Sequence, residues 1–144
     1  MIYFDTAYIA KCYLAEPGAE HVQALAELAD GLCSCEIARA ELFATLHRHL
    51  REGRITRTQL RRVVALFEEE ERQAVWHWLP VTSDLVRTTC DAIGALRANV
   101  FVRSADALHL QCAREHGHDV LYTNDRHMIL AAQHFGMTAR NVIP

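Results

Sequence analysis

The sequence has no apolar run long enough to cross a membrane, because charged residues interrupt each apolar stretch well before the roughly 20 residues that a spanning helix needs. Its first residues also lack the basic segment followed by an apolar segment that marks a secretory leader. We therefore expect a soluble protein of the cytoplasm. With 144 residues, about half of them apolar, we expect one compact domain over residues 1–144.

The five cysteines include no C-x-x-C pair, and an odd number fits a secreted disulfide framework poorly. We interpret them as reduced, partly buried thiols. Cys33 and Cys35 would project from the same side of a strand, but no second pair of cysteines or histidines stands at the spacing of a zinc site. The nine histidines lack that spacing as well. The sequence therefore does not favour zinc.

Two motifs of common α/β enzymes are also missing. No G-x-G-x-x-G stretch is present, which disfavours a dinucleotide-binding domain. Asp5, at the end of the first apolar stretch, is followed by Thr6 and Ala7 and so does not form the D-x-D of haloacid-dehalogenase-type phosphatases. The sequence disfavours both classes.

Short apolar stretches alternate with longer segments of helical periodicity along the chain. We expect strands at residues 2–5, 32–37, 76–81, 120–124 and, at the sheet edge, 138–143. We expect helices at residues 6–16, 21–30, 37–52, 56–67, 83–97, 105–116 and 125–135. Thr56 and Gln59 form a capping-box signature, and Ser104 can cap the helix that follows it. Strands that alternate with long helices predict an α/β fold of three layers, with a mostly parallel central sheet flanked by helices.

Four acidic residues stand where this fold would bring them to one edge of the sheet. Asp5 and Asp125 follow predicted strands, Glu41 lies in the first turns of the helix after the second strand, and Asp106 lies one turn into a later helix. In open parallel sheets, functional groups gather beyond the carboxyl ends of the strands. All four side chains can therefore reach one rim.

Each acid taken singly has a structural explanation, because aspartates cap helices and acids in a first turn favour the helix dipole. That explanation does not account for the apolar neighbours of Asp5, Glu41 and Asp106. Two like charges 4 Å apart repel by roughly 4 kcal/mol at an effective dielectric near 20, so a cluster needs either protonation or a cation. A set of oxygen ligands suits Mg²⁺ or Mn²⁺, which activate water and stabilise charge on a phosphoryl group.

Four segments stand out together, and they occur in the order FDTAYIAKCYLAEPGAEHV, ARAELFATLHR, RSADALHLQCAREHG and VLYTNDRHMILAA, the last followed by the segment around Gly136. In this order and spacing they resemble PIN-domain ribonucleases, and more closely the VapC-like toxins of bacterial toxin–antitoxin systems. The resemblance spans nearly the whole chain. It implies a PIN-like fold and an endoribonuclease that uses Mg²⁺ or Mn²⁺ to hydrolyse RNA.

The resemblance also assigns site residues. The residues that it implies as catalytic and metal-binding are Asp5, Glu41, Asp106 and Asp125. The residues that it implies as orienting the carboxylates or the water on the metal are Thr6, Thr123 and Asn124. Ala7 stands where many relatives carry serine, which removes a hydroxyl near the first acid. His109 shares a helix face with Asp106, and the resemblance assigns it to packing or hydrogen bonding, because imidazole is not a preferred Mg²⁺ ligand.

Positive charge is concentrated in one segment, although the net charge is −3. Six arginines and a single acid, Glu52, lie within residues 48–62. Arg48 follows Glu41 by seven residues, which returns it to nearly the same helix face about 10 Å further along. Our hypothesis is that Arg48, together with Arg51 and other arginines of this segment, contacts the RNA backbone. A solvated arginine face or a dimer contact explains the same pattern.

The resemblance implies two kinds of protein partner, a small antitoxin that occupies the rim and a second copy of the chain in a homodimer. The alternative function is a catalytically inactive PIN-like module that binds RNA or a protein without cutting it. A cleavage assay distinguishes the two functions.

Overall fold

The computed structural model describes residues 1–144, and at its centre lies a five-stranded sheet in the order β3-β2-β1-β4-β5. The strands are β1 (Ile2–Phe4), β2 (Leu32–Cys35), β3 (Trp76–Leu79), β4 (Val120–Tyr122) and β5 (Thr138–Arg140). Every neighbouring pair is parallel, so the predicted mostly parallel sheet is confirmed. Each strand begins at the predicted residue but ends earlier than predicted, and after each of the first four strands the chain turns toward the next helix.

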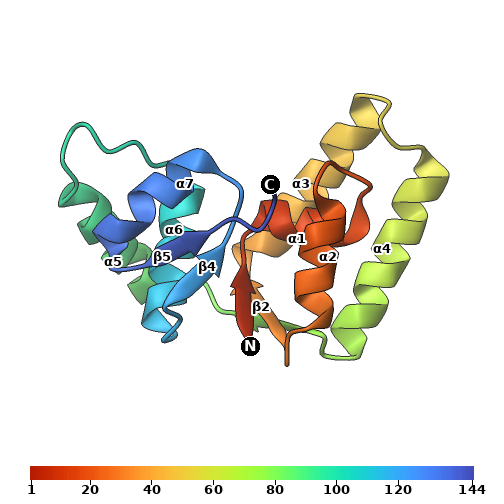
Figure 1. Ribbon diagram of the computed structural model, residues 1–144. Coiled ribbons are helices and arrows are strands. Elements are labelled where there is room, and N and C mark those ends of the chain that lie inside the picture. The colour runs from red at the N-terminus through yellow and green to blue at the C-terminus, as the bar shows by residue number, and fades with distance from the viewer.

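Two groups of helices cover the two faces of this sheet. The first group comprises α1 (Thr6–Tyr13), α2 (Ala19–Glu27), α3 (Ile37–Arg51) and α4 (Arg57–Arg72). The second comprises α5 (Ser83–Gly94), α6 (Ser104–Glu115) and α7 (Arg126–Ala131), which continues into the short 3-10 helix η1 (Ala132–Phe135). Figure 1 shows the first group on the right of the view and the second on the left. The three-layer α/β fold is therefore confirmed.

Each helix group packs on its own apolar core, and successive residues of β1 point into different cores. Tyr3 belongs to the cluster that includes Leu110 of α6, whereas Phe4 belongs to the cluster that includes Leu42 of α3 and Phe67 of α4. This alternation is the period of two that a strand imposes on its side chains. Burial of each large apolar side chain contributes roughly 2 kcal/mol, so both cores hold the helices against the sheet.

The helix starts follow the local sequence, with one exception. The capping box of α4 is confirmed, because the Gln59 backbone N–H donates to the Thr56 hydroxyl at 3.1 Å and the Thr56 N–H donates to the Gln59 side chain at 2.8 Å. The prediction that Ser104 caps α6 is wrong. Arg103 has the extended backbone of the capping residue, and Ser104 is already the first helical residue. No helix of this fold has both the length and the apolar character of a membrane span.

The order of the strands reverses beside β1, because β2 lies on one side of it and β4 on the other. Such a switch point opens a crevice at the carboxyl ends of the two strands, where α1 and α7 begin. The segment after β5 crosses back toward α1, and the C-terminus lies near that helix in Figure 1. There the Tyr8 hydroxyl donates to the Asn141 side chain at 2.8 Å and accepts from the Val142 N–H at 2.8 Å.

Candidate active site

A cleft of about 510 Å³ opens at the carboxyl ends of β1 and β4. Its lining includes the four predicted acids, Asp5, Glu41, Asp106 and Asp125. They come from four different elements or connections that are up to 120 positions apart in the sequence, and only the parallel topology brings them together. Their roles in catalysis and metal binding stay predictions.

Asp5 is the most buried of the four acids, with only 4% of its surface exposed. It caps α1, because its Oδ1 accepts the backbone N–H of Tyr8 at 2.8 Å, and its Oδ2 accepts a hydrogen bond from the Thr123 hydroxyl. Burial raises the pKa of Asp5 from 3.8 to about 6, although both hydrogen bonds favour the ionised form. The carboxylate therefore forms only when the pH approaches neutrality.

Glu41 is held by a hydroxyl and an imidazole. Its Oε2 accepts from the Thr6 hydroxyl at 2.5 Å and lies 2.9 Å from Nε2 of His109. Burial is the largest single effect and acts to raise the pKa of Glu41, but the contacts with His109 and Thr6 and the charge of Arg103 together outweigh it, so the pKa is lowered. Burial acts to lower the pKa of His109, but the carboxylate of Glu41 raises it. Glu41 is therefore kept ionised by its neighbours.

His109 is itself positioned by a strand residue. The ring is buried, and its Nδ1 lies 2.9 Å from the Tyr3 hydroxyl, which accepts the backbone N–H of Cys35 at 3.0 Å. With the hydroxyl donating to Nδ1, the proton of a neutral ring lies on Nε2 and points at Glu41. His109 is thus a hydrogen-bonding residue, which matches the expectation from the sequence.

Asp106 and Asp125 are joined by an arginine that the sequence analysis did not assign a role. Arg103 donates from Nε to Oδ2 of Asp106 at 2.8 Å and from Nη2 to Oδ2 of Asp125. The hydrogen bond to Asp106 is the largest effect that raises the pKa of Arg103, so the guanidinium stays charged. Asp125 also caps α7, because its Oδ1 accepts the backbone N–H groups of His127 at 2.7 Å and Met128 at 3.2 Å.

The donor set fits Mg²⁺ or Mn²⁺ in its chemistry, since four carboxylates line one cleft. As the side chains lie here, no three histidine, cysteine or acidic residues form a group that could hold a metal ion. The contacts explain why: a guanidinium bridges Asp106 and Asp125, and hydroxyl and imidazole groups hold Asp5 and Glu41. Asp106 and Glu41 each keep one carboxylate oxygen without a hydrogen bond from the protein.

The other predicted residues divide between those that touch the acids and those that do not. Thr6 and Thr123 each donate to one of the acids. Asn124 is exposed and its side chain makes no hydrogen bond. Arg48 lines the cleft, whereas Arg51 is exposed and does not line it. The sequence analysis missed Arg103, although this residue stands only three positions before Asp106, at the start of the helix that carries it.

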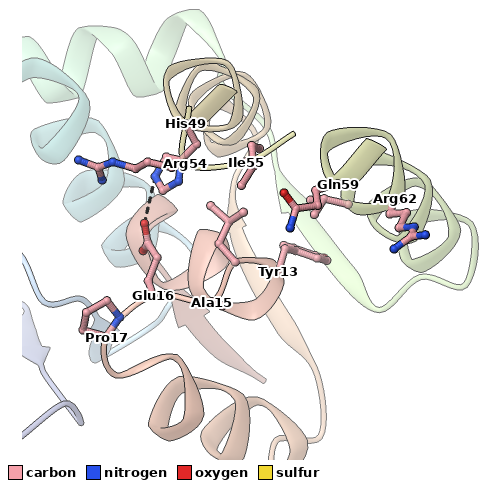
Figure 2. A pocket seen from close by; sticks show the side chains of 11 residues that line it. Tyr13, Ala15, Glu16, Pro17, His49, Arg54, Ile55, Gln59 and Arg62 are labelled. Carbon is pink, nitrogen blue, oxygen red and sulfur yellow. Dashed lines mark ion pairs between the residues drawn. The ribbon is translucent and has the colours of Figure 1, made fainter. Parts of the chain in front are cut away.

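A second cleft, of about 570 Å³, adjoins the first at Glu16, which lines both. Figure 2 shows Glu16 facing His49, with Arg54 beside His49 and Arg62 further along α4. The Glu16 Oε1 and His49 Nε2 lie 3.1 Å apart, at ion-pair distance but without the alignment of a hydrogen bond. On the other side of Glu16, Oε2 accepts from the buried Lys11 ammonium at 3.1 Å, which gives Lys11 a structural role.

Comparison with known proteins identifies the family. The profile of the PIN domain matches residues 2–133. No curated protein matches the sequence significantly. Since the profile covers most of the chain, it shows membership on sequence grounds alone.

Several solved structures share the fold at low sequence identity. VapC20 of Mycobacterium tuberculosis, a sarcin-ricin loop cleaving toxin, superposes with a TM-score of 0.72 at 16% identity over 91% of this chain and 95% of its own. FitAcB of Neisseria gonorrhoeae gives 0.72 at 18% identity over 98% and 97%. VapBC2 of Rickettsia felis, bound to a promoter DNA fragment, gives 0.59 at 17% identity over 98% of each chain. The architecture, the cleft at the switch point and the profile agree, and this chain belongs to the PIN domain family.

Proposed function

We propose that this protein is a Mg²⁺- or Mn²⁺-dependent endoribonuclease that hydrolyses RNA phosphodiester bonds and acts as the toxin of a toxin–antitoxin pair. The observation that carries the proposal is the gathering of four acids in one cleft at the switch point of the sheet. Membership of the PIN domain family and the likeness of the fold to VapC20, a toxin, support it.

The residues that would hold the ion are among Asp5, Glu41, Asp106 and Asp125. A divalent ion bound there supplies an activated water and stabilises charge on the phosphoryl group. The protein contributes the orientation of the ligands. Thr123 holds the Asp5 carboxylate, and the contact from His109 keeps Glu41 ionised in its half-buried position. Because water is the nucleophile, the RNA 2′-hydroxyl is not required for the reaction, and preference for RNA must come from shape and base contacts.

The position of basic side chains along the two clefts supports a path for the RNA backbone. Arg48 lines the acidic cleft, and Arg54 and Arg62 line the adjoining cleft beyond Glu16. Arginine side chains that line two adjoining clefts suit contacts with the phosphates that flank the scissile one. We assign Arg48 to phosphate binding, with Arg51 as a further contact on the exposed surface of α3.

The partners are a small antitoxin that covers the acidic rim and a second copy of this chain, and the site of action is the cytoplasm. The likeness to VapC20 and to VapBC2 supports the antitoxin. Co-purification of a small protein partner from the native host, followed by loss of RNA cleavage in the complex, tests this part.

The central experiment compares RNA cleavage by wild-type protein, Asp5→Asn and Asp30→Asn. Asp30 is exposed and lies outside the cleft, so its variant is a matched control for the loss of one carboxylate. Cleavage should be lost in Asp5→Asn, kept in Asp30→Asn, inhibited by EDTA and restored by Mg²⁺ or Mn²⁺. Full cleavage by Asp5→Asn in the presence of chelator contradicts the proposal. Binding of RNA by wild-type protein without cleavage indicates the inactive module instead.

A further inference from the structure

Arg103 is the one basic side chain that pairs with two of the four acids. It stands at the start of α6, and its guanidinium reaches across to the start of α7. The side chain is 58% exposed, so it can leave this position without uncovering the apolar core. Its two partners are less exposed, at 12% for the Asp106 side chain and 23% for the Asp125 side chain, so the guanidinium brings positive charge to carboxylates that lie partly out of solvent.

The four acids differ in the number of hydrogen bonds that they accept. Asp125 accepts three, since two backbone N–H groups share its Oδ1 and the guanidinium occupies its Oδ2. Asp106 accepts one, and only at Oδ2. Glu41 is contacted only at Oε2, and Asp5 accepts one at each oxygen. Asp125 is therefore the carboxylate whose oxygens accept the most hydrogen bonds from the protein itself.

We infer that Arg103 is a positioning residue that holds Asp106 and Asp125 together, and that Asp125 acts on a bound cation through Arg103 and is not one of its ligands. This inference rests on the proposed metal-dependent function. Direct contact with the ion then falls to Asp5, Glu41 and Asp106. Asp125 anchors the guanidinium and caps α7, and in both roles its oxygens face donors of the protein.

The arrangement has a consequence for metal affinity. A guanidinium and a divalent cation that share the Asp106 carboxylate repel one another, since they carry charge of the same sign in a partly buried cleft. Removal of the guanidinium should therefore tighten cation binding. Removal of the Asp125 charge should lower cation affinity mainly while Arg103 is present, because Asp125 acts on the cation through that side chain.

The test is a double-mutant cycle with Mn²⁺ affinity as its readout, measured by calorimetry or electron paramagnetic resonance without RNA. The variants are Arg103→Gln, Asp125→Asn and the double variant. Asparagine caps helices as well as aspartate does, so α7 keeps its start. The matched control is Arg126→Gln, because Arg126 is exposed, neighbours Asp125 in sequence and pairs with none of the acids. It removes the same net charge from the same end of the sheet.

Arg103→Gln should raise Mn²⁺ affinity about tenfold, and Arg126→Gln should raise it less than about threefold. In the Arg103→Gln background, Asp125→Asn should lower Mn²⁺ affinity by less than about fivefold. Arg103→Lys keeps one charge but cannot bridge both carboxylates, so its affinity should lie between those of the wild type and Arg103→Gln. Circular dichroism spectra check that each variant folds.

Two results overturn the inference alone. One is Mn²⁺ binding by the wild type that Arg103→Gln does not tighten beyond the Arg126→Gln control. The other is a loss of about fivefold or more when Asp125→Asn is added to Arg103→Gln, because a direct ligand keeps its effect without the arginine. Absence of Mn²⁺ binding in both the wild type and Arg103→Gln overturns the proposed metal-dependent function together with the inference.

Discussion

The two sides of the acidic cleft are built on different physical principles. On the side of α1 and α3, Asp5 and Glu41 are held by the hydroxyls of Thr123 and Thr6 and by the imidazole of His109, and Asp5 is the most buried of the four acids. On the side of α6 and α7, a charged guanidinium holds the acids. Burial makes the ionisation of Asp5 costly and raises the pKa of this carboxyl to about 6. The side that holds Asp5 should therefore respond to pH, and the side that holds Arg103 should respond to salt.

The largest expected difference between the two sides is in cleavage. Asp5→Asn should reduce the cleavage rate by roughly 100-fold or more, because it removes a negative charge that no basic side chain of the protein neutralises. Asp125→Asn should cost clearly less, because the remaining acids keep their places and α7 keeps its cap. Rate constants at saturating Mg²⁺ measure both. Equal losses would erase the distinction between the two sides.

The dependence of stability on pH should distinguish the two acids on the side of α1 and α3. The pKa of Asp5 is raised from 3.8 to about 6, so between these values the folded protein keeps a proton that the unfolded chain has released, and stability falls as the pH rises from 3.8 to about 6. The cost at pH 8 is on the order of 2–3 kcal/mol. Asp5→Asn avoids this cost and should be the more stable protein at pH 8 in chelator, with a smaller advantage at pH 4.

Urea denaturation at the two pH values provides the measurement. Glu41→Gln is the control of opposite sign, because the pKa of Glu41 is lowered and its ionised form stabilises the fold at neutral pH. Glu41→Gln should therefore be less stable than the wild type at pH 8. If Asp5→Asn were destabilised at pH 8 to the same degree, burial would not be what sets the pKa of Asp5.

A smaller effect should follow from Thr123→Val. The hydroxyl that donates to Asp5 lowers the pKa of that carboxyl. In a plot of cleavage rate against pH, loss of the hydroxyl should therefore move the acidic limb upward by roughly one pH unit. The backbone N–H of Asp125 also loses its acceptor, which costs about 1 kcal/mol of stability. Thr123→Ser keeps the hydroxyl and should retain the wild-type profile. An unshifted limb in Thr123→Val would show that Asp5 does not govern it.

The smallest effect is expected for Arg48→Ala, which should weaken RNA binding a few-fold and lower the slope of log affinity against log salt by about one. Arg48 lines the cleft but pairs with none of its acids, so the cleft itself should be unchanged. Arg97 is exposed on the side of α5, and Arg97→Ala is the control. Fluorescence anisotropy over a salt series measures both variants. Unchanged affinity and slope in Arg48→Ala would remove the residue from the RNA path.

Local patterns predicted much of this architecture, because the alternation of apolar stretches and helices specifies a parallel sheet whose strand ends meet. The four acids could be chosen before the fold was known, since each follows or enters an element at that edge. The Arg103 contact with Asp125 spans 22 residues and depends on how α6 and α7 pack. The Tyr3 contact with His109 spans 106 residues, and no periodicity encodes it. Ser104 failed as a cap because the helix begins one residue earlier than its polar side chain suggests.

The last residues of the chain contact residues that hold Asp5, although they lie outside the acidic cleft. The Arg140 carbonyl accepts the backbone N–H of Thr123 at 2.9 Å, and the Tyr8 hydroxyl lies between Asn141 and Val142. Tyr8 in turn gives its N–H to Asp5. A tag or fusion that pulls this tail away would thus loosen the Asp5 carboxylate without touching the cleft, and engineering of this protein should begin at its other end.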